Sequence, residues 1–166
     1  DPAVVNLTAF ETSFQEKRPF FVEGNDIFRF GEMGNNSQLF YSRRVGRGPQ
    51  GSMPSGTAFS NRPDASTILA AAKLSGRTAN GWSLGFLEAF TDREQAEFVL
   101  DDGGTGEQIV EPYTNYFVGR ARKNLRQGET TIGLIGSAVN RKLETPALEE
   151  VLRSNAYVAG ADFNHE

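Results

Sequence analysis

The sequence predicts an all-β fold built from long antiparallel hairpins. From Tyr113 to Arg141, side-chain character changes at every second position along two arms of about ten residues, and a period of two indicates strands. Thr67 to Thr91 repeats this arrangement, with Asn80-Gly81 as the hairpin signal between its arms. The composition agrees, because 18 glycines, 13 phenylalanines and a mean hydropathy of −0.43 suit strands better than a helical bundle.

The alternation assigns the side chains of each arm to opposite faces of a sheet. In the 113–141 hairpin, Gln127-Gly128 supplies the reversal of the chain. One face of the first arm carries Thr114, Tyr116, Arg120 and Arg122. The other face carries Phe117, Gly119 and Ala121. In the 67–91 hairpin, one face of the first arm carries Ile68, Ala70, Ala72 and Leu74, and the other carries Lys73, Ser75 and Arg77. The return arm groups Trp82, Leu84, Phe86 and Phe90. The last arm, Asn155 to His165, separates Tyr157 and Phe163 from Asp162.

The other elements are shorter. A capping-box spacing at Thr8-Ala9-Phe10-Glu11 predicts a helix over about residues 9–17, which Pro19 ends. Thr145-Pro146 predicts a second helix over 146–153, with Leu148, Val151 and Leu152 as its apolar side. Residues 48–64 and 92–112 have the composition of loops. We therefore expect a single partial domain over 1–166, irregular with short strands in 1–64 and regular antiparallel hairpins in 65–166.

Arm length and loop order indicate a more specific architecture. Arms of about ten residues exceed the usual soluble strand of about five or six and match the roughly 9–11 residues of a tilted membrane-crossing strand. The connections alternate in length: short after Arg77, long after Thr91, short after Lys123 and long after Arg141. Short turns on one rim and long loops on the other are typical of an outer-membrane-type β-barrel, here a curved open part of one. A soluble β-sandwich can show the same alternation.

Composition excludes several classes of function. A net charge of −4 and a pI of about 5.1 argue against nucleic acid as a partner. The sequence has no cysteine, which excludes a disulfide framework and thiolate metal sites, and its single histidine, His165, leaves no basis for a histidine metal site or a Ser-His-Asp triad. No apolar run reaches the about 18 residues of a spanning helix. We expect no cofactor and assign no catalytic or metal-binding residue.

Several long motifs carry a resemblance to a known family. They are Glu16-Lys17-Arg18-Pro19-Phe20-Phe21-Val22-Glu23-Gly24-Asn25-Asp26-Ile27-Phe28, Leu39-Phe40-Tyr41-Ser42-Arg43-Arg44-Val45-Gly46-Arg47, Ala71-Ala72-Lys73-Leu74-Ser75-Gly76-Arg77-Thr78, Glu111-Pro112-Tyr113-Thr114-Asn115-Tyr116-Phe117-Val118-Gly119-Arg120 and Ala138-Val139-Asn140-Arg141. In this order, over nearly the whole chain, they resemble the bacterial envelope family of domain of unknown function 5916. Its members join a family-9-type carbohydrate-binding module to a C-terminal β-barrel-like domain. The resemblance implies an internal slice of that C-terminal domain and a place in the bacterial cell envelope, in the outer membrane or periplasm. It supplies no activity.

Strand-borne cations and the aromatic Tyr116 are the candidate ligand-binding residues. If they line a barrel lumen, they would attract anionic or sugar-acid ligands; the candidates are Arg43, Lys73, Arg77, Tyr116, Arg120, Arg122 and Arg141. The interpretation we favour is structural, with the cations paired to acids such as Glu88, Asp92 and Asp162, because polar lumens are normal in such folds. The aromatics Trp82, Tyr41, Tyr113, Tyr116 and Tyr157 suit an interfacial girdle better than a sugar-stacking platform.

Three functional hypotheses follow. The leading one is a non-enzymatic, membrane-associated β-barrel-type structural domain fragment, linked to carbohydrate binding or handling. Its partners would be membrane lipid or detergent, the remaining strands of a parent chain or subunits of a larger membrane complex, and carbohydrate. The second is a soluble or peripheral module that docks on a larger membrane complex. The third, a glycan hydrolase domain using acids such as Glu88 and Asp92, is disfavoured because their spacing fixes no separation between two carboxylates.

Overall fold

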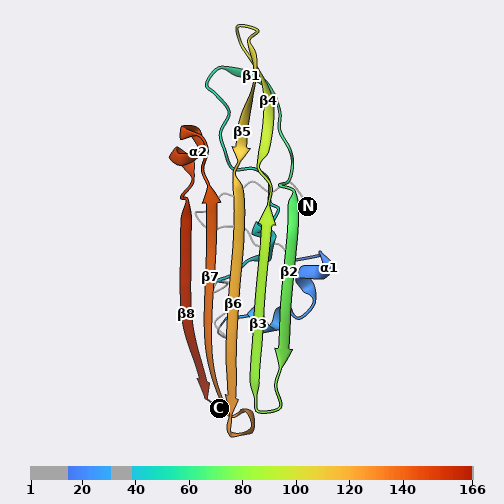
Figure 1. Ribbon diagram of the computed structural model, residues 1–166, viewed down its shortest axis with the longest axis vertical. Coiled ribbons are helices and arrows are strands. Elements are labelled where there is room, and N and C mark those ends of the chain that lie inside the picture. The colour runs from blue at the N-terminus through green and yellow to red at the C-terminus, as the bar shows by residue number, and fades with distance from the viewer. Residues whose placement is uncertain (1–14, 31–38, 166) are drawn as a thin grey trace.

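The computed structural model describes residues 15–30 and 39–165, and most of the chain in these ranges is strand, as predicted (Figure 1). Its strands form two antiparallel sheets, one of order β1-β4-β5 and one of order β2-β3-β6-β7-β8. The elements, in chain order, are α1 (Pro19–Val22), η1 (Asn25–Phe28), η2 (Ser42–Arg44), β1 (Thr57–Asn61), β2 (Ile68–Arg77), β3 (Trp82–Thr91), β4 (Glu94–Leu100), β5 (Thr105–Glu111), β6 (Tyr113–Leu125), η3 (Arg126–Gly128), β7 (Thr130–Lys142), α2 (Pro146–Val151) and β8 (Asn155–His165).

Both predicted hairpins lie in the five-stranded sheet. β2 pairs with β3, and β6 pairs with β7 over 13 residues of each strand, which is longer than the ten-residue arms expected. The turn between β2 and β3 needs its glycine: Gly81 has φ +85°, and a Cβ there would lie 2.8 Å from the carbonyl oxygen of Asn124. The tight turns lie at one end of the sheet and the longer connections at the other (Figure 1).

The polar segment 92–112 is not the loop that its composition predicts. β4 follows β3 almost directly, and β5 leads into β6 (Figure 1). β4 and β5 pair with each other, and so they extend the antiparallel pair of β3 and β6. β1, inside the supposed loop 48–64, pairs with β4. β4 still alternates: Ala96, Phe98 and Leu100 are less exposed than the positions between them. The polar residues and glycines of the segment, which are typical of loops, concealed this alternation.

The N-terminal helix prediction is wrong where it can be checked. Residues 9–14 lie outside the described part, and residues 15–17 have no regular structure. The helix instead begins at Pro19, which the prediction used as a stop. Proline suits the first helical position, because its fixed φ is helical and its missing N–H would have no partner there.

The second predicted helix is confirmed as α2, with one difference in its buried side. It begins at Pro146 as expected and ends at Val151, two residues earlier than predicted. Leu148 and Leu152 are buried, whereas Val151 is exposed. Thr145 occupies the N-cap position, but its side chain makes no capping hydrogen bond.

A β-bulge changes the face of one predicted residue. Between Ile68 and Ala70 the β2–β3 register shifts, so that Ile68 lies opposite Thr91 and not in line with Ala70 and Leu74. An extra residue in one strand reverses the side on which the following side chains point. Ile68 therefore packs against the core, and the remaining β2 assignments hold.

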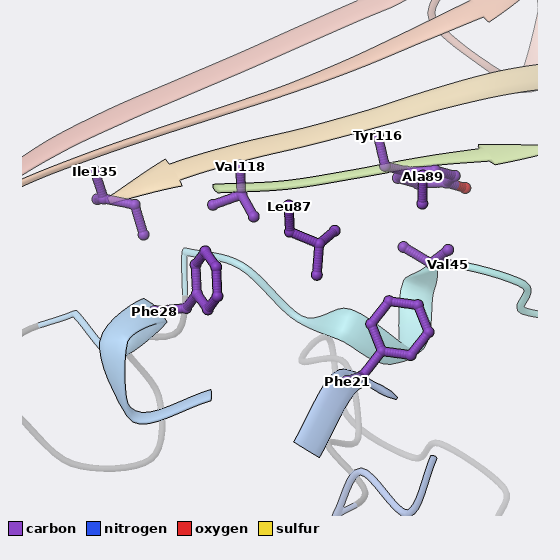
Figure 2. Packing of buried hydrophobic residues seen from close by; sticks show 8 residues of the cluster. All are labelled: Phe21, Phe28, Val45, Leu87, Ala89, Tyr116, Val118 and Ile135. Atoms are coloured by element: carbon purple, nitrogen blue, oxygen red, sulfur yellow. The ribbon is translucent and has the colours of Figure 1, made fainter. Parts of the chain in front are cut away.

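Residues 15–30 and 39–47, which we call the N-terminal or covering segment, cover one face of the five-stranded sheet (Figure 2). Phe21 from α1, Phe28 from η1 and Val45, which follows η2, pack against buried side chains of β3, β6 and β7; the strand residues are Leu87, Ala89, Tyr116, Val118 and Ile135. We call this covered face the inner face and the opposite face the outer face. Period-two alternation leaves the inner positions of β3 buried and the outer ones exposed.

Glycines on the inner face make room for this covering segment. A Cβ at Gly85 would lie 2.7 Å from a methyl carbon of Ile27 and 3.0 Å from the Phe28 ring. A Cβ at Gly160 would lie 2.7 Å from the ring of Phe30. The strands therefore carry bare backbone where the N-terminal segment approaches most closely.

Candidate functional site

The structure places six of the seven predicted ligand-binding residues on the inner face. Cross-strand pairing puts Arg120 opposite Gly85 and Ile135, and Lys73 opposite the buried Leu87. The same alternation places the others on this face; they are Arg77, Tyr116, Arg122 and Arg141. Arg43 lies in η2, within the covering segment and not on a strand. Whether these residues bind a ligand stays a prediction.

Several of these cations hold the N-terminal segment in place. Lys73 donates hydrogen bonds to the backbone carbonyls of Phe20, which is in α1, and Glu23, which is the C-cap residue of α1. Arg77 forms an ion pair of 2.6 Å with Asp26 in η1. Arg43 donates a 3.1 Å hydrogen bond to the carbonyl of Gln15. Two of the inner-face cations, Lys73 and Arg77, are therefore engaged by the chain's own covering segment.

Arg120 is the most buried cation of the set. Its side chain is 1% exposed, and its Nη2 lies 2.6 Å from Oδ2 of Asp162 on β8. The guanidinium also lies 5.4 Å from the centre of the Phe30 ring. Gly133 lies beneath it, because a Cβ there would come within 2.8 Å of both terminal nitrogens of Arg120. Of the three acids predicted as partners for the cations, Asp162 is the one the structure places correctly.

A second polar group lies on the inner face near the α2 end. Arg141 donates a 3.0 Å hydrogen bond to the carbonyl of Arg153, and Tyr116 is within electrostatic range of Arg47, Arg141 and Glu111. Glu111 is buried and accepts a 2.8 Å hydrogen bond from the backbone N–H of Gln50. The sequence did not predict this buried contact, because Glu111 lies in a segment interpreted as a loop. The contact of Glu111 joins β5 to Gln50, and the contact of Arg141 joins β7 to the chain that follows α2.

Glu16 and Arg18 form an ion pair that holds residues 16–18 against Ser42 and Val45. Arg18 binds Glu16 at 2.7 Å and donates to the carbonyls of Val45 and Ser42, while the Ser42 hydroxyl donates to Glu16 at 2.6 Å. Burial alone would raise the pKa of Glu16, but the hydrogen bonds from Arg18 and Ser42, with the charge of Arg18, outweigh it and lower the pKa to about 2.

We expect Glu16 to make stability dependent on acid pH. A carboxyl group whose pKa falls on folding stabilises the fold above its ordinary value of 4.5 and loses this contribution as pH falls toward about 2. The difference in unfolding free energy between the native chain and Glu16→Gln should therefore shrink across that window. Urea denaturation at several pH values measures it. Arg18→Gln should reduce the same pH dependence, and an unchanged difference across the window would contradict the role of Glu16.

The outer face carries a continuous band of exposed apolar side chains, and the charged strand residues of this face are Glu88, Lys123 and Lys142. Pairing aligns Leu74 with Phe86, Ala121 with Leu134, and Ile132 with Phe163, so that successive rows across the sheet are apolar. The large exposed members are Leu74, Leu84, Phe86, Phe90, Phe117, Ile132, Leu134, Tyr157 and Phe163. From Trp82 to Phe90 the band extends about 26 Å along β3 at about 3.3 Å per residue.

Polar and aromatic residues lie at both ends of this band. At the tight-turn end, Trp82 pairs with Lys123, whose ammonium lies 5.3 Å from the indole ring centre. At the other end, Asn115, Asn140 and Asn155 form one row, and Tyr113 pairs with Lys142 beyond it. The five predicted aromatics therefore do not form one platform: Trp82, Tyr113 and Tyr157 are on the outer face, whereas Tyr116 is on the inner face and Tyr41 is in the covering segment.

The other acids expected to pair with inner-face cations do not do so. Glu88 points to the outer face, where its Oε1 accepts a 3.0 Å hydrogen bond from Asn115. Asp92 follows the end of β3 and accepts a 2.8 Å hydrogen bond from the backbone N–H of Arg93. Glu88 is two residues from both Phe86 and Phe90, so the alternation of the sequence already predicts that it lies on the same face as these two residues. Each carboxylate has a local partner and neither faces a described groove.

Residues 15–30 and 39–165 contain no group of three or more His, Cys, Asp or Glu side chains able to hold a metal ion. Within the same ranges, every helix is too short or too polar to cross a bilayer.

Comparison with known proteins identifies the family. A model of a protein family described as a domain of unknown function (DUF5916) matches residues 1–162. The match covers almost the whole chain, so the chain belongs to this family. No curated protein and no solved structure matches the sequence.

Proposed function

We propose that this chain is part of the wall of a membrane β-barrel, with its outer face toward lipid hydrocarbon and its inner face toward the lumen. The proposed role is structural and not enzymatic. The observation that carries it is the apolar band on the outer face, which has aromatic and lysine side chains at both ends. A band of about 25 Å with aromatic girdles at both margins is the pattern of outer-membrane-type barrels.

The polarity of the two faces supports this proposal. Strands in such barrels tilt by about 35–45°, so about 26 Å along β3 covers roughly 20 Å of the about 25 Å that the apolar band of a barrel spans along the membrane normal. Water-facing sheets usually carry polar side chains on the face that does not pack on the core. Here the face without a covering layer is the more aromatic one, and the polar and charged side chains gather on the covered face.

The edges of the large sheet also support it. β2 and β8 each pair on one side alone among the described residues. Unpaired N–H and C=O groups along such long strands are costly in lipid, and closure by further strands satisfies them. The barrel would thus be completed by strands of a parent chain or of neighbouring subunits. Within it, the N-terminal segment would fill the lumen beside this part of the wall.

Depth-dependent quenching of Trp82 tests the proposal. Trp82 is the one tryptophan of the chain and lies at the tight-turn margin of the band. With the full chain reconstituted in phosphatidylcholine vesicles, lipids brominated near the headgroup should quench it more than lipids brominated at mid-chain. In Trp82→Phe/Phe86→Trp the order should reverse, because position 86 lies in the middle of the band.

Two outcomes would count against the barrel wall. One is a chain that remains monomeric in buffer without detergent and whose tryptophan no brominated lipid quenches. The other is equal quenching depth for the two tryptophan positions, which indicates binding parallel to the surface. The first outcome would instead favour the soluble docking module.

A further inference from the structure

We infer that the small β1-β4-β5 sheet carries a binding groove for an extended, basic segment of polypeptide. The groove has a volume of about 530 Å³, within the range of about 300–1,000 Å³ typical of ligand sites. This site lies beyond the apolar band and is independent of the proposed lipid contact. It is lined from all three strands of the small sheet.

Two rows of side chains form the groove face. Cross-strand pairing aligns Phe59 with Val99 and Val99 with Thr105, which gives a mainly apolar row. In the next row on the same face, two residues away on each strand, pairing aligns Asn61 with Glu97 and Glu97 with Glu107, which gives an acidic row. Phe59 is 76% exposed and pairs with the exposed Val99, so this row offers an apolar surface to an occupant.

The acidic row determines the charge of the occupant. Glu97 and Glu107 lie directly opposite each other on adjacent strands, an arrangement that is destabilising for like charges. The nearest described partner is Asn61, which donates a long hydrogen bond of 3.4 Å to Glu97. Residues 95–108 contain four acids and no lysine or arginine. A cationic group placed between the two glutamates would relieve this repulsion.

The spacing of the rows determines the shape of the occupant. Positions two residues apart on a strand are separated by about 7 Å, which is also the distance between alternate side chains of an extended peptide. A peptide with a lysine or arginine at one position and an aromatic or aliphatic residue two positions later would therefore match both rows. This periodicity favours an extended polypeptide over a small amine.

A labelled peptide tests this inference on the full chain. The probe is fluorescein-labelled acetyl-Ser-Lys-Ser-Phe-Ser-Lys-Ser-amide, and binding is measured by fluorescence anisotropy. Glu97→Gln/Glu107→Gln should weaken binding about tenfold, which corresponds to two modest charge contacts. Phe59→Ala should weaken it by a similar factor. Asp101→Asn/Asp102→Asn is the matched control, because it removes the same charge from the exposed turn outside the groove and should change binding less than about threefold.

Four results would overturn the inference. They are undetectable binding of the probe up to about 1 mM, equal weakening by the two double variants, equal binding of a probe with glutamate in place of lysine, and complete displacement of the probe by millimolar Ca²⁺. Equal weakening would indicate a diffuse negative field, and displacement by Ca²⁺ would indicate a cation site. None of these measurements depends on lipid, so failure here leaves the barrel-wall proposal intact.

Discussion

Phe86→Arg is expected to destabilise the chain in lipid vesicles by about 2–4 kcal/mol, the cost of an arginine near the bilayer midplane on the lipid face of a barrel. Phe86 lies in the middle row of the outer band, opposite Leu74 and Gly119. The guanidinium would have to leave hydrocarbon by distorting the lipid or the sheet. Urea denaturation of the reconstituted full chain measures the effect.

Phe90→Arg is the matched control for this prediction. It is the same substitution on the same strand and face, four residues further along, in the row that contains Asn115 and Asn140. Phe86 is 43% exposed and Phe90 is 44% exposed, so burial within the protein does not distinguish them. Near the interface the cost should fall to about 0–1 kcal/mol. Equal losses of unfolding free energy at the two positions would contradict a lipid-facing band, because in water an arginine would have the same cost at both.

Asp162→Asn is expected to lower the unfolding free energy by about 3 kcal/mol, because it leaves the charge of Arg120 buried without its carboxylate. The control is Asp26→Asn. Its ion pair with Arg77 has the same 2.6 Å length, but the side chains are 56% and 69% exposed, so the loss should be about 0.2–1 kcal/mol. Urea denaturation of the three chains under identical conditions compares them.

The double variant Arg120→Met/Asp162→Leu separates charge burial from packing. Replacing both partners with apolar side chains removes the buried charge, so it should cost less than Asp162→Asn alone. A double variant that is the less stable of the two would show that packing of the pair, and not its charge, holds β6 and β8 together. Similar losses for Asp162→Asn and Asp26→Asn would likewise exclude the buried charge as the cause.

Most of the large sheet was predictable because period two is a local property. The residues of β3, β6, β7 and β8 alternate cleanly, since one face meets the covering segment and the other stays outside. β4 and β5 were not predicted, because residues 92–112 have the polar composition of a loop, although Ala96, Phe98 and Leu100 alternate with more exposed positions. α1 was not predictable either: Phe20-Phe21-Val22 has strand-like composition, and a tertiary contact, the packing of Phe21 on the inner face, accompanies the helix.

The inner-face position of the candidate cations was also predictable, but their partners were not. Lys73 binds two backbone carbonyls of α1, and a carbonyl acceptor has no signature in the sequence. Asp162 was predicted as one of three acids available to the cations, but its pairing with Arg120 in particular was not predicted. Arg43 was misplaced because Leu39 to Arg47 resembles a strand and folds as a 3-10 turn with flanking coil. The link to carbohydrate stays a prediction.

The position of the N-terminal segment has a consequence for the order in which the chain assembles. Phe30 lies against Gly160 of β8 and over Arg120 of β6, so its binding surface is synthesised long after it. Closing such long loops has an entropic cost before any contact compensates for it, and folds dominated by distant contacts form slowly. The aromatic side chains of Phe20 to Phe30 therefore stay exposed to solvent until β8 has been synthesised and has paired. During biogenesis, a chaperone that shields Phe20 to Phe30 would act at the step where aggregation competes most strongly with maturation.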